Sequence, residues 1–180
     1  MQRDRGFMDL ELFKKLMVEL EPYLYNINLY FQGEPMLHPL FFLFIENSKN
    51  THSVVSTNGH FLSEENSKRI VKSGLHKLII SLDGIDQEAY SAYRSDGKVD
   101  TVIEGIKNVT DAKKRFNSPL KIEIQFLVNR INEPQIPQVR QLAKKVNVSL
   151  SLKSMQILKK EDIDYWLPLS RRFRRYKRKD

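Results

Sequence analysis

Residues 26–39 read NINLYFQGEPMLHP, and this stretch indicates the fold of the whole chain. Ile27, Leu29 and Phe31 alternate with more polar neighbours, so the pattern predicts a strand over Asn26–Phe31. The strand pattern then stops at a glycine and a proline.

The segment after this strand forms a stiff turn with one acidic side chain. Gly33 frees the backbone, and Pro35 biases Glu34 toward an extended conformation. Glu34 is therefore expected at the C-terminal end of a strand, which is where α/β sheets place ligand-binding groups. The alternative is an ordinary strand-to-helix turn with a solvated glutamate.

The rest of the chain alternates strand-like and helix-like patterns. We expect further strands over His52–Ser56, Lys77–Leu82, Lys121–Val128 and Val148–Lys153, and helices that begin near Asp9, Leu40, Ser63, Asp86, Val99 and Pro137. Alternation of this kind predicts a parallel sheet.

The phase of each strand indicates how the sheet curves. One face of four of these strands is apolar and suits packing against helices, including Ile27, Leu29 and Phe31 on the first strand. The other face carries polar side chains, namely Gln32, Ser81, Asp83, Gln125, Ser149, Ser151 and Lys153. An open sheet buried on both faces would be more continuously apolar, so we favour a curved, barrel-like sheet with a polar ligand at one end.

Composition places the chain among soluble globular proteins. Its 180 residues are 41% hydrophobic and 29% charged, which suits one domain with a real core. No apolar run approaches the roughly 20 residues that span a bilayer, and no apolar signal segment stands near the N-terminus. We expect a cytoplasmic protein that does not contact membranes.

The chain has no cysteine, so its own residues form no disulfide and no thiolate-held metal site. The four histidines (His38, His52, His60 and His76) also lack the close spacing typical of metal ligands. We expect no metal site in these residues.

The net charge of +8 is concentrated at one end. Residues 171–180 hold seven basic residues and one acid, a net of +6, which leaves +2 for the remainder. A body so near neutrality argues against nucleic-acid binding. The basic end could contact RNA or an acidic surface, but such runs are more often solvated or disordered.

Four short motifs occur in a fixed order along the predicted strands: GEPML at 33–37, STNG at 56–59, SLDG at 81–84, and Tyr93-Arg94. Together they resemble the radical S-adenosylmethionine (radical SAM) superfamily. The resemblance implies an α/β fold, a partial (β/α)6 TIM-like barrel that lacks the first βα unit. It implies a barrel over residues 1–158.

Residues 159–180 would then form a basic linker. Within it, Trp166–Arg178 resembles the connection to a C-terminal SPASM domain, which we expect to be absent from this chain.

The resemblance also implies which residues bind S-adenosylmethionine. Gly33, Glu34 and Pro35 match a turn that binds the amino group of the cofactor, and Gln32 stands where the family usually has a glycine. Ser81 matches a residue that contacts the methionine carboxylate or the ribose.

Four further residues complete the implied site. Arg94 would pair with the carboxylate, because a guanidinium fork suits that group. Asn58, Asp83 and Gln125 match positions on the adenosine or substrate side. The structural alternative is that Asp83 bonds turn amides and that Arg94 is a solvated charge at a helix end.

One departure from the family concerns its iron–sulfur cluster. Members carry a CxxxCxxC loop after the first strand, and its thiolates hold the 4Fe–4S cluster that reductively cleaves S-adenosylmethionine to a 5′-deoxyadenosyl radical. This sequence is expected to begin after that loop, and no other side chains replace three thiolates. We therefore expect the chain alone to be inactive, with an exposed sheet edge at Asn26–Phe31 that promotes edge pairing.

Three functions remain open from the sequence. The first is the core of a radical SAM oxidoreductase that acts on a peptide or protein. The second is a cluster-free α/β protein that binds a nucleotide or peptide without catalysis. The third is a cluster-independent barrel enzyme that uses Glu34 and Asp83 as an acid–base pair.

Overall fold

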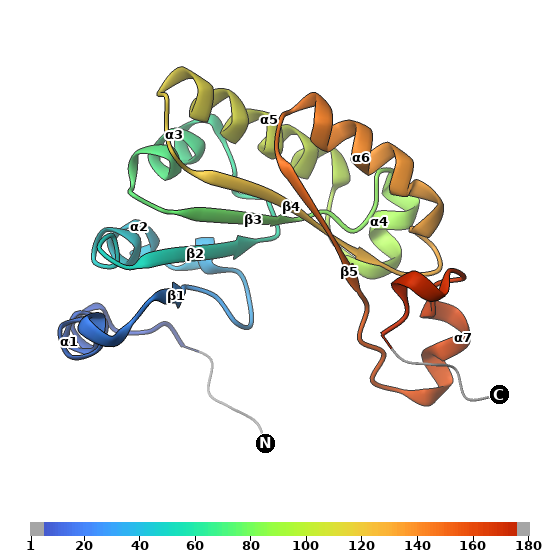
Figure 1. Ribbon diagram of the computed structural model, residues 1–180, viewed down its shortest axis with the longest axis horizontal. Coiled ribbons are helices and arrows are strands. Elements are labelled where there is room, and N and C mark those ends of the chain that lie inside the picture. Colours follow the sequence, from blue (N-terminus) through green and yellow to red (C-terminus); the bar gives the residue numbers. More distant parts are fainter. Residues whose placement is uncertain (1–5, 176–180) are drawn as a thin grey trace.

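The computed structural model describes residues 6–175, which form one curved parallel sheet covered by helices (Figure 1). The strand order is β1-β2-β3-β4-β5, with the bounds Asn26–Asn28, His52–Thr57, Lys77–Ser81, Lys121–Val128 and Ser149–Ser154. Because every crossover runs to the next strand in the same direction, and such crossovers are right-handed, the helices fall on one face. Figure 1 shows α3, α5 and α6 along the convex side. The predicted partial barrel is confirmed, and a doubly wound sheet is not observed in this part of the chain.

Helices lie between consecutive strands, before β1 and after β5. Their bounds are α1 Leu10–Leu20, α2 Phe41–Glu46, α3 Glu64–Lys72, α4 Gln87–Tyr93, α5 Val99–Arg115, α6 Ile136–Lys145 and α7 Ile163–Trp166. Three of them begin at side-chain caps: Asp9 accepts from the amide of Leu12, Ser63 from that of Asn66, and Asp86 from that of Ala89. Each cap satisfies an amide that the first turn would otherwise leave unpaired.

The core lies between the sheet and the helices of its convex face. On β4, every second residue from Ile122 to Val128 is buried, and Phe126 is 0% exposed. The parallel register sets Leu78 beside Ile122 and Ile80 beside Ile124, so the apolar sides of β3 and β4 share one face. The alternation predicted for β4 is confirmed, whereas β3 is buried on both faces from Leu78 to Ser81.

The first strand is shorter than the predicted Asn26–Phe31, because β1 ends at Asn28. Its last bond to the sheet runs from the Leu29 amide to the Val54 carbonyl (2.8 Å), after which the chain leaves the sheet. Phe31 is 90% exposed, so its predicted place on the apolar outer face is wrong. Within the described residues β1 pairs only with β2, so the expected open edge is observed.

The segment after β5 folds back onto the loop that follows β4. The Arg130 amide donates to the carbonyl of Trp166 (3.0 Å). The Glu133 carboxylate accepts from the amides of Leu169 (2.6 Å) and Ser170 (2.9 Å). Within the described part of the predicted linker, 159–175, the segment 166–170 is therefore bound to the barrel. Residues 176–180 lie outside the described residues, and the domain boundary near 158 stays a prediction.

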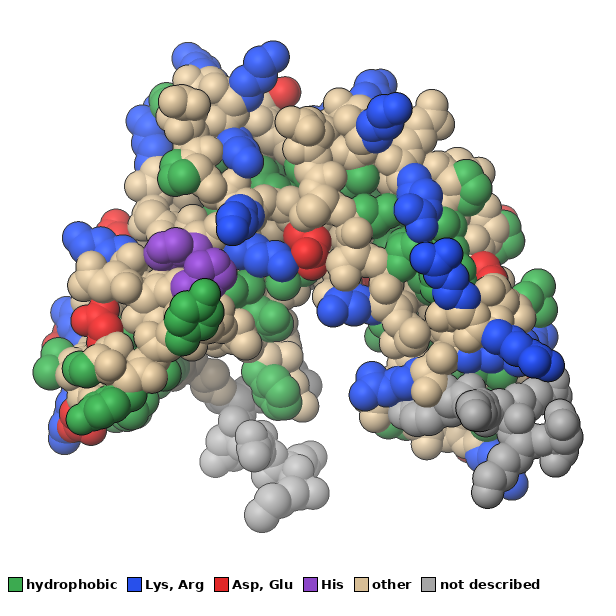
Figure 2. All heavy atoms as spheres, in the orientation of Figure 1, with side chains coloured by type: hydrophobic (Ala, Val, Ile, Leu, Met, Phe, Trp, Pro, Cys, Tyr) green, Lys and Arg blue, Asp and Glu red, His purple; other side chains and the backbone are tan. Residues whose placement is uncertain are grey.

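The sheet encloses a hollow. Figure 2 shows the molecule hollowed between the arm that carries α1 and β1 and the arm that carries β5 and α7. Between residues 6 and 175, no helix is both long and apolar enough to cross a membrane.

Candidate ligand site at the strand ends

Glu34 ties the end of β1 to the end of β2. Gly33 adopts φ +85°, a left-handed conformation that favours glycine, and Glu34 that follows is extended, as predicted. One carboxylate oxygen, Oε1, accepts from the Thr57 hydroxyl (2.8 Å) and from the Met36 amide (3.1 Å). The other, Oε2, accepts from the Asn58 amide (2.7 Å). These bonds leave the half-buried carboxylate with little further accepting capacity but with its charge.

The neighbours of Glu34 differ in their surroundings. Pro35 opens a single 3-10 turn, Pro35–Leu37, whose N-cap is Glu34 itself. Gln32 is exposed, and its side chain makes no hydrogen bond within residues 6–175. Thr57, which the sequence reading did not single out, is the buried hydroxyl that fixes Glu34.

A row of polar side chains crosses the concave face near the strand ends. The register sets Ser81 on β3 beside Gln125 on β4, and Gln125 beside Ser151 on β5. The side chains of these three residues have no hydrogen-bond partner in the described part of the chain. Their donors and acceptors are therefore available to a ligand.

Asp83 and Arg94 form an ion pair above this row. The Nε and Nη2 atoms of Arg94 each lie 2.8 Å from Oδ2 of Asp83, and the Leu127 amide donates to Oδ1 (3.1 Å). Asp83 is 1% exposed, whereas about a third of the Arg94 side chain is exposed. Asp83 therefore holds Arg94 in place, while the remaining N–H groups of the guanidinium are free to reach a ligand.

Burial raises the pKa of the Asp83 carboxyl, and Arg94 and the Leu127 amide oppose that rise. Burial alone would lower the pKa of Arg94, but the attraction of Asp83 outweighs it, so the pKa of Arg94 rises and the guanidinium stays charged.

The loop after β4 contains site-building residues that the sequence reading missed. The buried Asn132 side chain donates to the carbonyls of Asp83 and Leu127 (both 2.9 Å). Gln135 accepts from the Ile85 amide (2.7 Å) and donates to Asp86 (2.6 Å). The available signal was a pair of asparagines, Asn129 and Asn132, directly after a buried strand.

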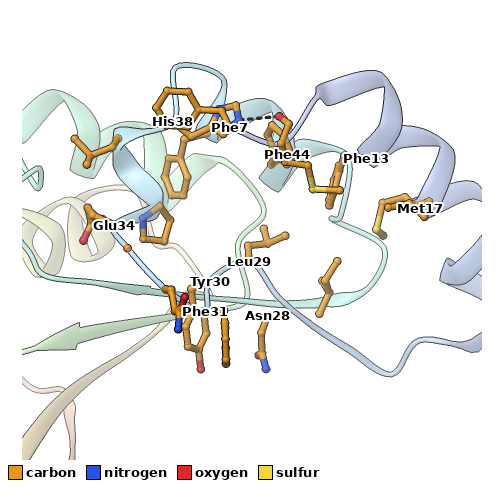
Figure 3. Close-up of a pocket in the computed structure, with 18 of the residues that line it drawn as sticks. Phe7, Phe13, Met17, Asn28, Leu29, Tyr30, Phe31, Glu34, His38 and Phe44 are labelled. Carbon is orange, nitrogen blue, oxygen red and sulfur yellow. Dashed lines mark hydrogen bonds between the residues drawn. The ribbon is translucent and has the colours of Figure 1, made fainter. Parts of the chain in front are cut away.

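A separate apolar groove of about 640 Å³ lies beside β1 (Figure 3). Its lining includes Phe13, Met17 and Phe44. It shares the predicted residues Gln32, Gly33, Glu34 and Pro35 but none of Asn58, Ser81, Asp83, Arg94 or Gln125. The structure thus brings the predicted residues to the C-terminal ends of the strands, and the apolar groove beside β1 shares only the Glu34 turn with them.

A comparison with protein families gives a match of residues 1–122 to the radical SAM superfamily. Since this match covers more than half of the chain, the chain belongs to the radical SAM superfamily. The predicted resemblance is confirmed at this level.

Individual relatives are similar but longer. A probable GTP 3′,8-cyclase of Methanocaldococcus jannaschii is 30% identical over 141 residues, covering 77% of this chain and 45% of the relative. The mycofactocin maturase MftC of Mycobacterium tuberculosis is 26% identical over 154 residues, covering 84% of this chain and 38% of the relative. The chain thus spans less than half the length of these curated relatives, whose names describe different reactions.

Solved structures share the fold. SuiB of Streptococcus suis, in a crystal structure with S-adenosylmethionine, matches with a TM-score of 0.66 at 13% identity, over 84% of this chain and 34% of SuiB. A domain of a pyruvate-formate lyase-activating enzyme from Bacteroides vulgatus matches with a TM-score of 0.58 at 15% identity, over 77% of this chain and 88% of that domain.

The donor set of this chain does not fit an iron–sulfur cluster. Such clusters are held by thiolates, and the 180-residue sequence has no cysteine. Between residues 6 and 175, no group of three His, Cys, Asp or Glu side chains could hold a metal ion. The strand ends do fit a polar organic ligand, because the guanidinium of Arg94 keeps free N–H groups and the side chains of Ser81, Gln125 and Ser151 have no hydrogen-bond partner in the described residues.

Proposed function

We propose that this chain forms the S-adenosylmethionine-binding wall of a radical SAM enzyme. The observation that carries the proposal is the charged Arg94, held on buried Asp83 at the strand ends that also present the unpartnered Ser81 and Gln125. A guanidinium fixed by an ion pair, beside polar groups without a partner, suits a ligand that has a carboxylate and several hydroxyl groups.

Each polar group of the cofactor has a counterpart in the proposal. The free N–H groups of Arg94 and the Ser81 hydroxyl would bind the methionine carboxylate. The charge of Glu34, beside Gly33, would attract the amino group. The side-chain amides of Asn58 and Gln125 would bind the ribose or adenine.

The proposal divides binding from chemistry. Reductive cleavage to a 5′-deoxyadenosyl radical depends in this family on the cluster, whose ligands these residues do not supply. The chain alone would therefore bind S-adenosylmethionine without cleaving it. An oxidoreductase reaction, a peptide or protein substrate and a SPASM-type extension belong to this proposal for the whole enzyme.

The test is isothermal titration of S-adenosylmethionine into the chain and into Arg94→Ala. A charge-assisted hydrogen bond contributes about 1.5–3 kcal/mol, so Arg94→Ala should weaken binding at least tenfold. Arg140→Ala is the matched control, because Arg140 is exposed on α6 and has no ion pair in the described residues. Equal binding by Arg94→Ala would contradict the site.

A parallel titration with GTP separates the nucleotide-binding alternative, for which relatives named GTP 3′,8-cyclase give a reason. Tighter binding of GTP than of S-adenosylmethionine, unaffected by Arg94→Ala, would favour that alternative.

A further inference from the structure

His60 joins the β2 exit to the start of α5. Its backbone amide donates to Oδ1 of Asn58 (2.9 Å), and its ring atom Nδ1 lies 3.2 Å from the same oxygen. On the other side of the ring, Nε2 lies 3.0 Å from the backbone amide of Lys98, the N-cap residue of α5. Both ring nitrogens are therefore engaged.

The partners fix the protonation of the ring. The Lys98 amide can only donate, so Nε2 must be the acceptor. The Asn58 oxygen can only accept, so Nδ1 must carry the proton. His60 is thus the neutral tautomer with its proton on Nδ1.

The same contacts fix the side-chain amide of Asn58. Its oxygen receives two hydrogen bonds from His60, whereas its NH2 group has no partner in the described residues. The Asn58 backbone amide donates to Glu34, so this free NH2 belongs to a residue bound directly to the candidate site. Asn58 therefore presents a donor, and the group that it recognises is an acceptor.

We propose that His60 is a positioning residue, which acts through Asn58 and only as the neutral tautomer. This inference rests on the proposed function, because the acceptor would be a ribose oxygen or adenine nitrogen of S-adenosylmethionine. If Nε2 were protonated, its N–H group would face the backbone N–H group of Lys98. The hydrogen bond that joins the ring to α5 would then be lost. Ligand affinity should then fall in acid.

The surroundings of His60 contain few other titrating groups. The Tyr90 ring of α4 lies 6.3 Å from it, and burial raises the pKa of that phenol, so it stays neutral in this range. Lys98 contributes a charged side chain, and Glu34 lies beyond Asn58. A Cβ at Gly97 would come within 2.5 Å of the Tyr90 ring and 3.2 Å of the imidazole, so glycine there leaves room for both rings.

The experiment compares His60→Gln with His60→Ala. Glutamine has an acceptor oxygen and a donor NH2 group but does not titrate, so it can replace both bonds. S-adenosylmethionine is titrated calorimetrically at about pH 7.5 and about pH 5.5, a range that spans ordinary histidine titration. Because the amino group of the ligand also titrates, variants are compared with the unaltered chain at the same pH.

We expect the unaltered chain to bind about three- to tenfold more weakly in acid, as for one lost hydrogen bond. His60→Gln should match it near pH 7.5 and lose most of this pH effect, while His60→Ala should bind weakly at both values. His52→Gln, at the start of β2 and away from the candidate site, should keep the full pH effect.

A ligand-free measurement separates this inference from the proposed function. The Lys98 backbone amide resonance should shift with pH in the unaltered chain and stay constant in His60→Gln. If it does so while no S-adenosylmethionine binds, the proposed function fails and the His60 link stands. A pH effect that persists in His60→Gln, or normal binding by His60→Ala, would overturn the inference.

Discussion

Strand β1 and strands β3 and β4 end in the same kind of polar turn, but the structure holds them differently. Leu78, Ile80 and Phe126 are fully buried, and Asp83 joins the two strand ends through the Leu127 amide. Strand β1 has three residues and one neighbour in the described sheet, and nearby Phe31 is 90% exposed.

The difference shows that the candidate site is built on two kinds of support. The β3–β4 half is positioned by a continuous core, whereas the β1 turn is positioned mainly by the bonds from Glu34 to Thr57 and Asn58. Core substitutions should therefore affect the whole fold, and a change at Glu34 should affect the β1 end locally.

The largest expected effect comes from the core. Phe126→Ala should lower the free energy of unfolding by about 3–5 kcal/mol, because it removes a fully buried ring from β4. Phe31→Ala should change it by less than about 0.5 kcal/mol, because that ring is exposed. Urea unfolding followed by circular dichroism measures both, and equal losses would contradict the comparison.

An intermediate effect is expected at the β1 tether. In Glu34→Gln, an NH2 group would face one of the donors that now bind the carboxylate. This should lower the stability of the β1 end by about 1–3 kcal/mol. Hydrogen exchange at the Leu29 amide, which bonds to Val54, should accelerate while exchange in β4 stays unchanged. Glu19→Gln, at an exposed position of α1, is the control. Faster exchange throughout the sheet would show that the effect of Glu34→Gln is not confined to the β1 end.

The smallest effect is a pH dependence at Asp83. Its pKa is raised in the folded chain, mainly by burial, so the folded state keeps this proton to higher pH than the unfolded state does. The contribution of this group to stability is therefore full below the unfolded pKa of about 3.9 and is lost as pH rises through the folded pKa.

Asp83→Asn has no such titration. The stability difference between the unaltered chain and Asp83→Asn should therefore shrink from about pH 4 to about pH 7. Urea unfolding across this range measures it, and a difference that grows with pH would mean that Arg94 outweighs the cost of burial.

The sequence predicted the β3–β4 half well because two constraints agree there. The alternation on β4 indicates one apolar and one polar face, and β4 pairs with a strand on each side, β3 along its first part and β5 along its last part. The sequence prediction failed at Phe31. An aromatic side chain favours a strand locally, but the length of a strand depends on pairing with a neighbouring strand, which the local pattern does not indicate.

The predicted residues of the candidate site do lie at the C-terminal ends of the strands, but the hydrogen bonds that hold them there were not predictable. Asn132 contacts Asp83 across 49 positions, and Thr57 contacts Glu34 across 23. Such pairs depend on the register between strands, which single-strand patterns do not set.

The central claim is that the polar strand ends bind S-adenosylmethionine. Amide chemical-shift mapping during titration with this ligand tests it most directly. The account predicts saturable shifts at Asn58, Ser81, Arg94 and Gln125. Saturable shifts confined to the apolar groove at Phe13, Met17 and Phe44, or none at millimolar ligand in a folded sample, would contradict it.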